Sequence, residues 1–270
     1  MKIQFFGTGA PEGNPSPFCV CKNCKYIRKY KGNNIRLQAS LLINADLLLD
    51  FGPDIRVAAN NAGISLTKLK YILVTHCHFD HWYAANLIFR LKGPRVGNIQ
   101  RLTVLGPKLL KKLAQEWIKE EQQVIIQPLD QWKDIQIGKY IVSTFPITQQ
   151  DLSAGKGMGY IINQNHKYIL YAVDTYELPK ELFKKWRSVS FDMIILDETF
   201  GLHPAPLKDH MHIAKVISSI DKLRENGNIS KKTKLYIQHM SHHNPPHDKL
   251  VSIMKQYDIS VPYDGLVIDI

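Results

Sequence analysis

The chain has 270 residues, and none of its apolar runs approaches the length that crosses a bilayer. A membrane-spanning helix needs ~20 consecutive apolar residues, so we expect no contact with a membrane. The first residues, Met1–Phe6, lead straight into Gly7 and are too few for the apolar core of a secretory signal. We therefore expect a cytoplasmic protein. Internal repeats and low-complexity stretches are also missing, which argues against repeat arrays and wholesale disorder.

Cysteine is scarce, and basic residues outnumber acidic ones. The four cysteines are Cys19, Cys21, Cys24 and Cys77. In a reducing compartment, the closeness of the first three suggests a metal rather than a disulfide. Lysine and arginine number 35 against 24 aspartates and glutamates, which gives a net charge of +11. That surplus favours anionic partners such as phosphoesters, nucleic acid or acidic lipid, and says nothing about the fold.

Short apolar runs alternate with helical patterns from end to end, as in an α/β protein. The expected strands are Lys2–Phe6, Ala39–Ile43, Asp46–Asp50, Tyr71–Thr75, Leu102–Leu105, Tyr140–Phe145, Gly159–Asn163, Tyr168–Val173, Met193–Leu196, Lys234–Ile237 and Leu266–Ile270. The expected helices are Pro53–Asn61, Asp80–Leu91, Pro107–Glu121, Pro179–Trp186, Ile213–Glu225 and Asp248–Tyr257. In each half of the chain, strands in hairpins come first and strands that alternate with helices follow. This order predicts two mixed β-sheets packed together with helices outside, in a single domain over 1–270.

A histidine cluster follows the apolar run Tyr71–Thr75. It contains His76, His78, Asp80 and His81. Imidazole and carboxylate together suit zinc, iron, manganese or cobalt, and two groups of them suit a two-metal hydrolytic site. The alternative is a polar helix start, with Asp80 as the N-cap and the histidines in solvent. That alternative explains Asp80 and leaves the histidines unexplained.

The motif Thr75-His76-x-His78-x-Asp80-His81 after an apolar strand resembles the signature of the metallo-β-lactamase superfamily. Further motifs along the chain carry the same resemblance: Gly7-Thr8-Gly9, Asp50-Phe51-Gly52, Val173-Asp174-Thr175, His239 and Asp264-Gly265. The resemblance implies the αβ/βα four-layer sandwich. It also implies that His76 and His78 hold one metal and that Asp80, His81 and His239 hold the other, with Asp174 bridging. The alternatives are a strand-end cap for Asp174 and a surface position for His239.

One expected ligand is missing from this pattern. The superfamily normally supplies a third histidine to the first metal from a Pro-x-x-His turn. The matching stretch here is Pro146-Ile147-Thr148-Gln149, which puts Gln149 at the histidine position. An amide oxygen is a weaker ligand than imidazole for a borderline-soft cation. The sequence therefore predicts a first metal that is weakly held, and a second that keeps its ligands.

A second candidate metal site lies in the loop at about 11–31, where Cys19, Cys21 and Cys24 form a C-x-C-x-x-C pattern. Structural zinc takes four ligands in a closed tetrahedron, and His242, shortly after His239, is the predicted fourth. A redox pair and free thiols are the alternatives. Together with the intact histidine motif, this cluster resembles the PhnP-type phosphodiesterase that accompanies carbon–phosphorus lyase, and also the coenzyme PQQ synthesis protein B branch.

The leading functional hypothesis is a phosphodiesterase in which a metal-bound hydroxide attacks phosphorus, with a small cyclic or nucleotide-like substrate. One or two Zn²⁺ or Mn²⁺ ions are expected in the reactive site. His210 matches the superfamily histidine that faces the metals and is the candidate general acid beside Asp80; a solvated helix start is the alternative. A second hypothesis is an RNA-processing endonuclease, because basic runs such as Lys22–Arg36 suggest a nucleic-acid partner. A third is an accessory metal-binding protein with a degenerate site. A homodimer is a further expectation.

Replacing Gln149 tests the departure from the superfamily pattern. We expect wild-type protein to hold the first metal below stoichiometry and to gain activity when Mn²⁺ or Zn²⁺ is added. Gln149→His restores an imidazole, so the variant should retain more metal through dialysis and hydrolyse phosphodiesters faster at low metal concentration. Elemental analysis of the dialysed proteins checks this. Two fully occupied reactive-site metals in the wild type would refute it.

Overall fold

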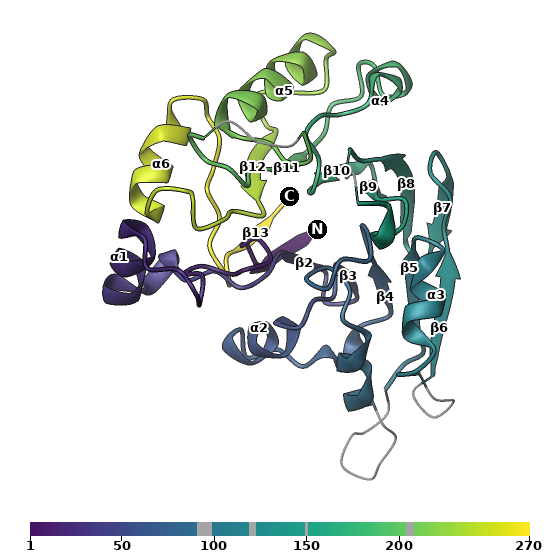
Figure 1. Cartoon of the computed structure of the whole chain (residues 1–270). Coiled ribbons are helices and arrows are strands. Elements are labelled where there is room, and N and C mark those ends of the chain that lie inside the picture. The colour runs from purple at the N-terminus through teal and green to yellow at the C-terminus, as the bar shows by residue number, and fades with distance from the viewer. Residues whose placement is uncertain (91–98, 119–122, 149–150, 204–207) are drawn as a thin grey trace.

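Two mixed β-sheets lie face to face in the computed structural model, which describes residues 1–90, 99–118, 123–148, 151–203 and 208–270 (Figure 1). The first sheet has seven strands in the order β13-β1-β2-β3-β4-β5-β6, and the second has six in the order β12-β11-β10-β9-β8-β7. Those of the first are β1 (Lys2–Gly7), β2 (Ser40–Ile43), β3 (Leu47–Leu49), β4 (Tyr71–Leu73), β5 (Leu102–Gly106), β6 (Val124–Pro128) and β13 (Val267–Asp269). Those of the second are β7 (Asp134–Ile137), β8 (Tyr140–Pro146), β9 (Met158–Gln164), β10 (Lys167–Ala172), β11 (Met193–Asp197) and β12 (Lys234–Gln238).

Helices cover the outer faces of both sheets. They are α1 (Lys22–Tyr30), α2 (Ile55–Asn61), α3 (Leu109–Ala114), α4 (Lys180–Lys185), α5 (Ile213–Glu225) and α6 (His247–Lys255), and a 3-10 helix spans Ala84–Arg90. In Figure 1, α4, α5 and α6 lie on the side of the second sheet, while α2 and α3 lie on the side of the first. Among the described residues, no helix is both long and apolar enough to span a bilayer.

Three apolar layers separate the four layers of secondary structure. Alternation along single strands shows this: Leu41 and Ile43 of β2 face the second sheet, while Leu42 faces outward toward Ala58 of α2. On the other side, Leu170 of β10 packs outward with the residues of α4, α5 and α6. Because successive side chains of a strand point to opposite faces, both sheets are apolar on both faces. The predicted two mixed sheets with outer helices, an αβ/βα sandwich, are confirmed.

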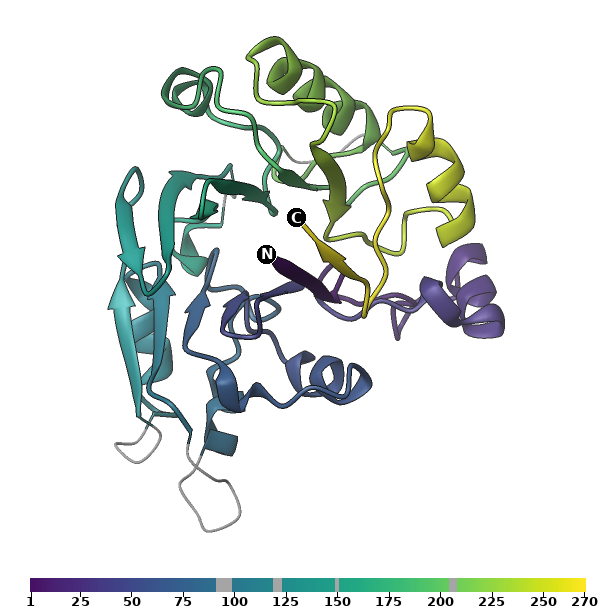
Figure 2. The same ribbon diagram turned by 180° about the vertical axis from the view of Figure 1, so that it is seen from behind.

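The two ends of the chain meet at one edge of the first sheet. Strand β1 pairs antiparallel with β13, and the amino group of Met1 donates to the carbonyl of Ile270 at 2.7 Å. Figure 2 shows both termini side by side at this edge. The sheet therefore closes with the last strand of the sequence beside the first.

Several sequence expectations differ from the structure in detail. The predicted helix Asp80–Leu91 is wrong in type and start, since a 3-10 helix begins only at Ala84. The predicted helix Pro107–Glu121 is shorter, because α3 ends at Ala114. Strands β6 and β7 and helix α1 were not predicted. In α1 the signal was hidden, because its first turn has no acidic residue and its N-cap is the thiol of Cys21.

The carboxyl ends of five strands converge on one edge of the sandwich. Strand β3 runs parallel to β4, and β10 runs parallel to β11 and β11 to β12. Parallel strands end at the same edge of their sheet. The residues at or just after these ends are therefore neighbours, and they are Asp50, the segment 75–81, Asp174, Asp197 and His239.

Candidate metal centre

The imidazole of His81 lies at the middle of a buried cluster. Its Nε2 is 2.5 Å from Asp174 Oδ2 and 3.0 Å from Asp80 Oδ2. On the opposite side of the ring, Nδ1 is 2.9 Å from Asp50 Oδ2. With Nδ1 on the side of Asp50, Nε2 is the nitrogen that faces the two other carboxylates. The alternative that leaves the histidines in solvent is wrong for His76 and His81, and a surface position is wrong for His239, because all three are fully buried, whereas the side chain of His78 is partly exposed.

His76 and His78 form a neighbouring pair. Nε2 of His76 is 2.8 Å from Nδ1 of His78, and it lies 3.6 Å from Asp174 Oδ2. The other nitrogen of each ring faces an oxygen: Nδ1 of His76 is 3.0 Å from Thr75 Oγ1, and Nε2 of His78 is 3.0 Å from Asp151 Oδ2. The two rings thus direct different nitrogens, Nε2 and Nδ1, toward each other.

Two threonine–aspartate pairs hold the histidines on the two sides of the cluster. Thr75 Oγ1 donates to Asp50 Oδ1 at 3.0 Å and so accepts from Nδ1 of His76. In the second sheet, Thr199 Oγ1 donates to Asp197 Oδ1 at 3.1 Å and lies 3.0 Å from Nδ1 of His239. Nε2 of His239 is then left facing Asp80 Oδ2 at 3.4 Å. The same device fixes the inward nitrogen of a buried histidine on each sheet.

His210 stands at the open side of the cluster, with its side chain 19% exposed. Its Nδ1 is 2.9 Å from Asp197 Oδ2 and 3.2 Å from Asp174 Oδ1. The ring stacks on that of His239, with centroids 5.2 Å apart. Nε2, on the far side of the ring from both carboxylates, is the nitrogen free for a ligand.

The carboxylates and imidazoles of this cluster shift one another's pKa values. Burial lowers the pKa of His81, but the carboxylates of Asp80, Asp174 and Asp50 together raise it well above its ordinary value. Burial also lowers the pKa of His210, but Asp197 and Asp174 outweigh it and raise this pKa to about 10. Burial alone would raise the pKa of Asp174, yet His239, His81 and His76 hold it well below its ordinary value. The carboxylates thus hold positive charge at the cluster, as a cation site requires.

A divalent cation fits the donor set. Two buried carboxylate oxygens lie inside the cluster: Asp80 Oδ1, which has no hydrogen-bond partner, and Asp174 Oδ2, whose near neighbours are the ring nitrogens of His81 and His76. A buried acceptor without a donor is costly, and a cation would satisfy both oxygens. Ligand atoms within 4.8 Å of one another occur in His76, His81 and Asp174, and again in Asp80, His81 and His239. The structure brings together the predicted residues His76, His78, Asp80, His81, Asp174 and His239, whereas Gln149 lies outside the described residues.

The backbone of the cluster is held in an unusual conformation. Asp50, Asp174 and His239 all have φ in the left-handed region, at 60°, 52° and 66°. Such residues persist where the surrounding structure determines them, and they gather at functional sites. Glycine at position 52 lets the backbone approach Asp80 closely, because a Cβ there would lie 2.1 Å from the carbonyl oxygen of Asp80.

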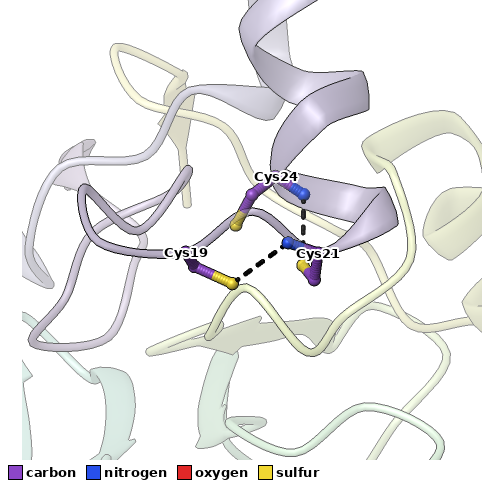
Figure 3. A group of neighbouring side chains, drawn as sticks. All are labelled: Cys19, Cys21 and Cys24. Carbon is purple, nitrogen blue, oxygen red and sulfur yellow. Dashed lines mark hydrogen bonds between the residues drawn. The ribbon is translucent and has the colours of Figure 1, made fainter.

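The three cysteines of the loop before α1 gather at the start of that helix (Figure 3). Their sulfurs lie within 4.8 Å of one another. Cys21 N donates to Cys19 Sγ and Cys24 N donates to Cys21 Sγ, both at 3.4 Å. Burial raises the pKa of the Cys24 thiol to about 12, so a metal would have to displace its proton. All cysteines are free thiols, and Cys77 packs in the outer apolar layer of the first sheet.

His242 lies beside this loop but outside the group of close sulfurs. Its carbonyl accepts from the side chain of Asn23 at 2.8 Å, and its Nδ1 lies 2.9 Å from Glu12 Oε1. The sequence named Asp50 and Thr75 only as motif residues and gave no role to any of the oxygens that hold the histidines: Asp50, Thr75, Asp151, Asp197, Thr199 and Glu12. An acidic or hydroxyl residue directly before a candidate ligand or at a strand end, as at Thr75 and Asp197, was the available signal.

The family model that matches this chain is the β-lactamase superfamily domain, over residues 46–245. Among curated proteins, ribonuclease Z of Saccharolobus islandicus is 26% identical over 190 residues, which cover 69% of this chain and 56% of that protein. Ribonuclease Z of Clostridium novyi is 22% identical over 205 residues, covering 72% of this chain and 56% of the relative. The chain thus matches little more than half the length of these curated relatives.

Solved structures share the fold over the whole chain. A diphosphatase of the PhnP family matches with a TM-score of 0.78 at 22% identity, over 100% of this chain and 97% of the other. Zn²⁺-bound PqqB from Methylobacterium extorquens matches with a TM-score of 0.76 at 17% identity, over 100% of both chains. The short form of human tRNase Z matches with a TM-score of 0.65 at 15% identity, over 100% of this chain and 99% of the other. With the matched domain covering the histidine cluster and the strands from β3 to β12, the chain belongs to the metallo-β-lactamase superfamily.

Proposed function

We propose that this protein is a metal-dependent phosphodiesterase. The observation that carries the proposal is a pair of adjoining ligand groups, with Asp174 lying 3.6 Å from His76 on one side and 3.5 Å from His239 on the other, because two such groups side by side suit an in-line displacement at phosphorus. Relatives and structural neighbours whose names refer to phosphate-bond chemistry, a ribonuclease Z and a PhnP-family diphosphatase, support it. The net charge of +11 favours an anionic substrate.

In this proposal, one metal is held by His76 and His78 and the other by Asp80, His81 and His239. Asp174 would serve both, since its Oδ2 lies 3.6 Å from Nε2 of His76 in the first group and its Oδ1 lies 3.5 Å from Nε2 of His239 in the second. When bound, Zn²⁺ or Mn²⁺ would supply an activated water and offset charge on the phosphoryl oxygens. The weak point is the first ion, for which the position of Gln149 offers no third imidazole.

The protein's own contribution at the reacting end is a proton held on His210. Asp197 Oδ2 accepts from Nδ1 of His210 at 2.9 Å and so orients the ring. Asp197 is itself fixed, because it also accepts from the backbone N–H of Asp174 at 2.8 Å and of Met211 at 2.9 Å. His210 thus sits on a rigid carboxylate with Nε2 free to donate a proton to the departing oxygen. Asp80 keeps its carboxylate charged beside His81 and His239 as a ligand.

We further propose that Cys19, Cys21, Cys24 and His242 bind one structural zinc. Zinc held by sulfur has Zn–S bonds of about 2.3 Å and places its sulfurs ~3.8 Å apart, so sulfurs already within 4.8 Å need only a small movement. Burial raises the pKa of the Cys21 thiol, but hydrogen bonds such as that from the N–H of Cys24 to Cys21 Sγ lower it below its ordinary value, which favours the thiolate that a metal binds.

A second candidate function is RNA processing, which the exposed face of α1 favours. Lys22, Lys25 and Lys29 are exposed there beside Tyr26 and Tyr30, whose rings lie 4.4 Å apart. Basic and aromatic side chains together suit a nucleic-acid strand. RNA binding that falls steeply with salt would support this candidate.

A third candidate is an accessory protein with a degenerate metal centre. Purified protein that contains no metal at the reactive site and does not hydrolyse a phosphodiester would support it.

Removing the shared carboxylate tests the main proposal. Asp174→Ala should abolish hydrolysis of bis(p-nitrophenyl) phosphate, because it removes the carboxylate that lies between His76 and His239. Zinc at the cysteines should remain, since the two sites share no ligand. Activity assays with metal analysis measure both effects, and Asp221→Ala, at an exposed aspartate of α5, is the matched control. A wild-type rate in Asp174→Ala would contradict the two-metal proposal.

The role of His210 depends on the leaving group. His210→Ala should slow hydrolysis by ~10²–10⁴-fold when the leaving group is an alkoxide, which needs a proton. The loss should be much smaller with p-nitrophenolate, which leaves without one. Comparing kcat for the two substrates gives the answer, with His166→Ala, at an exposed turn, as the control. Equal losses would point to charge stabilisation or binding instead.

Zinc at the cysteines should stabilise the fold, because metal binding and folding are coupled at such sites. Cys21→Ser should therefore lower the melting temperature and remove one zinc per chain. Differential scanning calorimetry and elemental analysis measure the two changes. An unchanged zinc content would reject the assignment of Cys21.

A further inference from the structure

One carboxylate oxygen of Glu12 accepts two hydrogen bonds from His242. Oε1 of Glu12 accepts from the backbone N–H of His242 at 3.2 Å and from Nδ1 of its ring at 2.9 Å. Both side chains are largely covered, with 28% of Glu12 and 17% of His242 exposed. The same carboxylate oxygen thus fixes both the peptide and the ring of this histidine.

The backbone carbonyl of the same histidine is held from within the cysteine motif. Asn23 stands between Cys21 and Cys24, and its Nδ2 donates to the carbonyls of His242 at 2.8 Å and of Asn244 at 2.6 Å. The loop itself is fixed by Arg28, which donates to the carbonyls of Cys19 and Ser16, each at 2.6 Å. Residues that flank the three sulfurs therefore hold His242 by its N–H, its carbonyl and its ring.

This arrangement decides which ring nitrogen of His242 is available. A neutral imidazole has one N–H and one lone pair. Because Glu12 takes the N–H of Nδ1, the lone pair is on Nε2. Histidines that bind metals are usually oriented in this way, by a carboxylate or carbonyl on the nitrogen that does not bind. Asp50 stands in the same relation to His81 in the buried cluster, at 2.9 Å.

We infer that Glu12 is a positioning residue for the cysteine site, which selects Nε2 of His242 as the fourth zinc ligand and holds the ring in place for it. The inference rests on the zinc site proposed above. To the four proposed ligands it adds Glu12, which does not bind the metal itself, and it names Nε2 as the binding nitrogen of His242. It also explains why an acidic side chain stands beside a loop that is otherwise basic. From Gly13 to Ala45 the sequence contains no acidic residue.

A purely structural role for Glu12 gives a different expectation. If the carboxylate only ties two loops together, its loss should lower stability equally with and without zinc. If it positions a ligand, its loss should weaken zinc binding and leave the metal-free protein nearly unchanged. The Glu12→Gln variant separates charge from geometry, because an amide oxygen still accepts both hydrogen bonds.

The experiment titrates Co²⁺ into the full-length, metal-free protein and follows the sulfur-to-metal charge-transfer band, which reports only metal bound by thiolate. We expect Glu12→Ala to weaken binding by ~10–100-fold, the usual cost of losing such a partner, and Glu12→Gln to weaken it less. The intensity of the tetrahedral d–d bands should fall in His242→Ala and, to a smaller extent, in Glu12→Ala. Glu225→Gln, at an exposed glutamate of α5, controls for the change of charge.

Melting temperatures with and without Zn²⁺ complete the test. The zinc-dependent part of the shift should shrink in Glu12→Ala, while the metal-free value should stay close to that of the wild type. Wild-type affinity in Glu12→Ala, or an equal loss of stability with and without zinc, would overturn the inference and leave the zinc site standing. A wild-type protein without a sulfur-to-metal band would instead overturn the zinc site and the inference together. An unchanged spectrum in His242→Ala would show that another group is the fourth ligand and would also overturn the inference.

Discussion

Among the described residues, each buried histidine of the candidate metal centre has an oxygen against the ring nitrogen that points away from the cluster. A neutral imidazole offers a metal its lone pair only on the nitrogen that carries no proton. Asp50 takes the proton of His81, Thr75 that of His76 and Thr199 that of His239. Thr75 and Thr199 are in turn fixed by Asp50 and Asp197. The donor set therefore depends on a buried outer ring of carboxylates and hydroxyls as much as on the ligands.

The packing of the sandwich offsets the free-energy cost of burying these carboxylates and hydroxyls. Buried carboxylates and left-handed backbone at Asp50, Asp174 and His239 are unfavourable by themselves. They occur where parallel strands of both sheets end, and these strands are anchored by apolar layers on both faces. A rigid scaffold is the general condition for holding strained residues and precise sites. The four-layer architecture thus positions the cluster and also stabilises it against its own electrostatic cost.

The sequence predicted the ligands better than their supports. His76, His78, Asp80 and His81 stand out because they are dense and follow a strand, and α5 was predicted with its observed bounds, Ile213–Glu225. Asp50 and Thr199 carry no such signal, since their importance comes from contacts with residues 31 and 40 positions away. Helix α1 was missed for a related reason: only Cys24 and Ile27 of its residues are buried, so it has no apolar stripe.

The segment from His239 to His242 joins the two candidate metal sites. Its first residue faces Asp80 and Asp174, and its last is held by Glu12 and Asn23 at the cysteine loop. Between them, Met240 pairs with the loop at Gly9, and Ser241 Oγ donates to the carbonyl of Thr199 at 2.6 Å. A stretch of four residues spans at most ~14 Å, and this one is tied at each position. A change that loosens the cysteine loop therefore acts on the position of His239, and stability at one site and metal geometry at the other are properties of the same short segment.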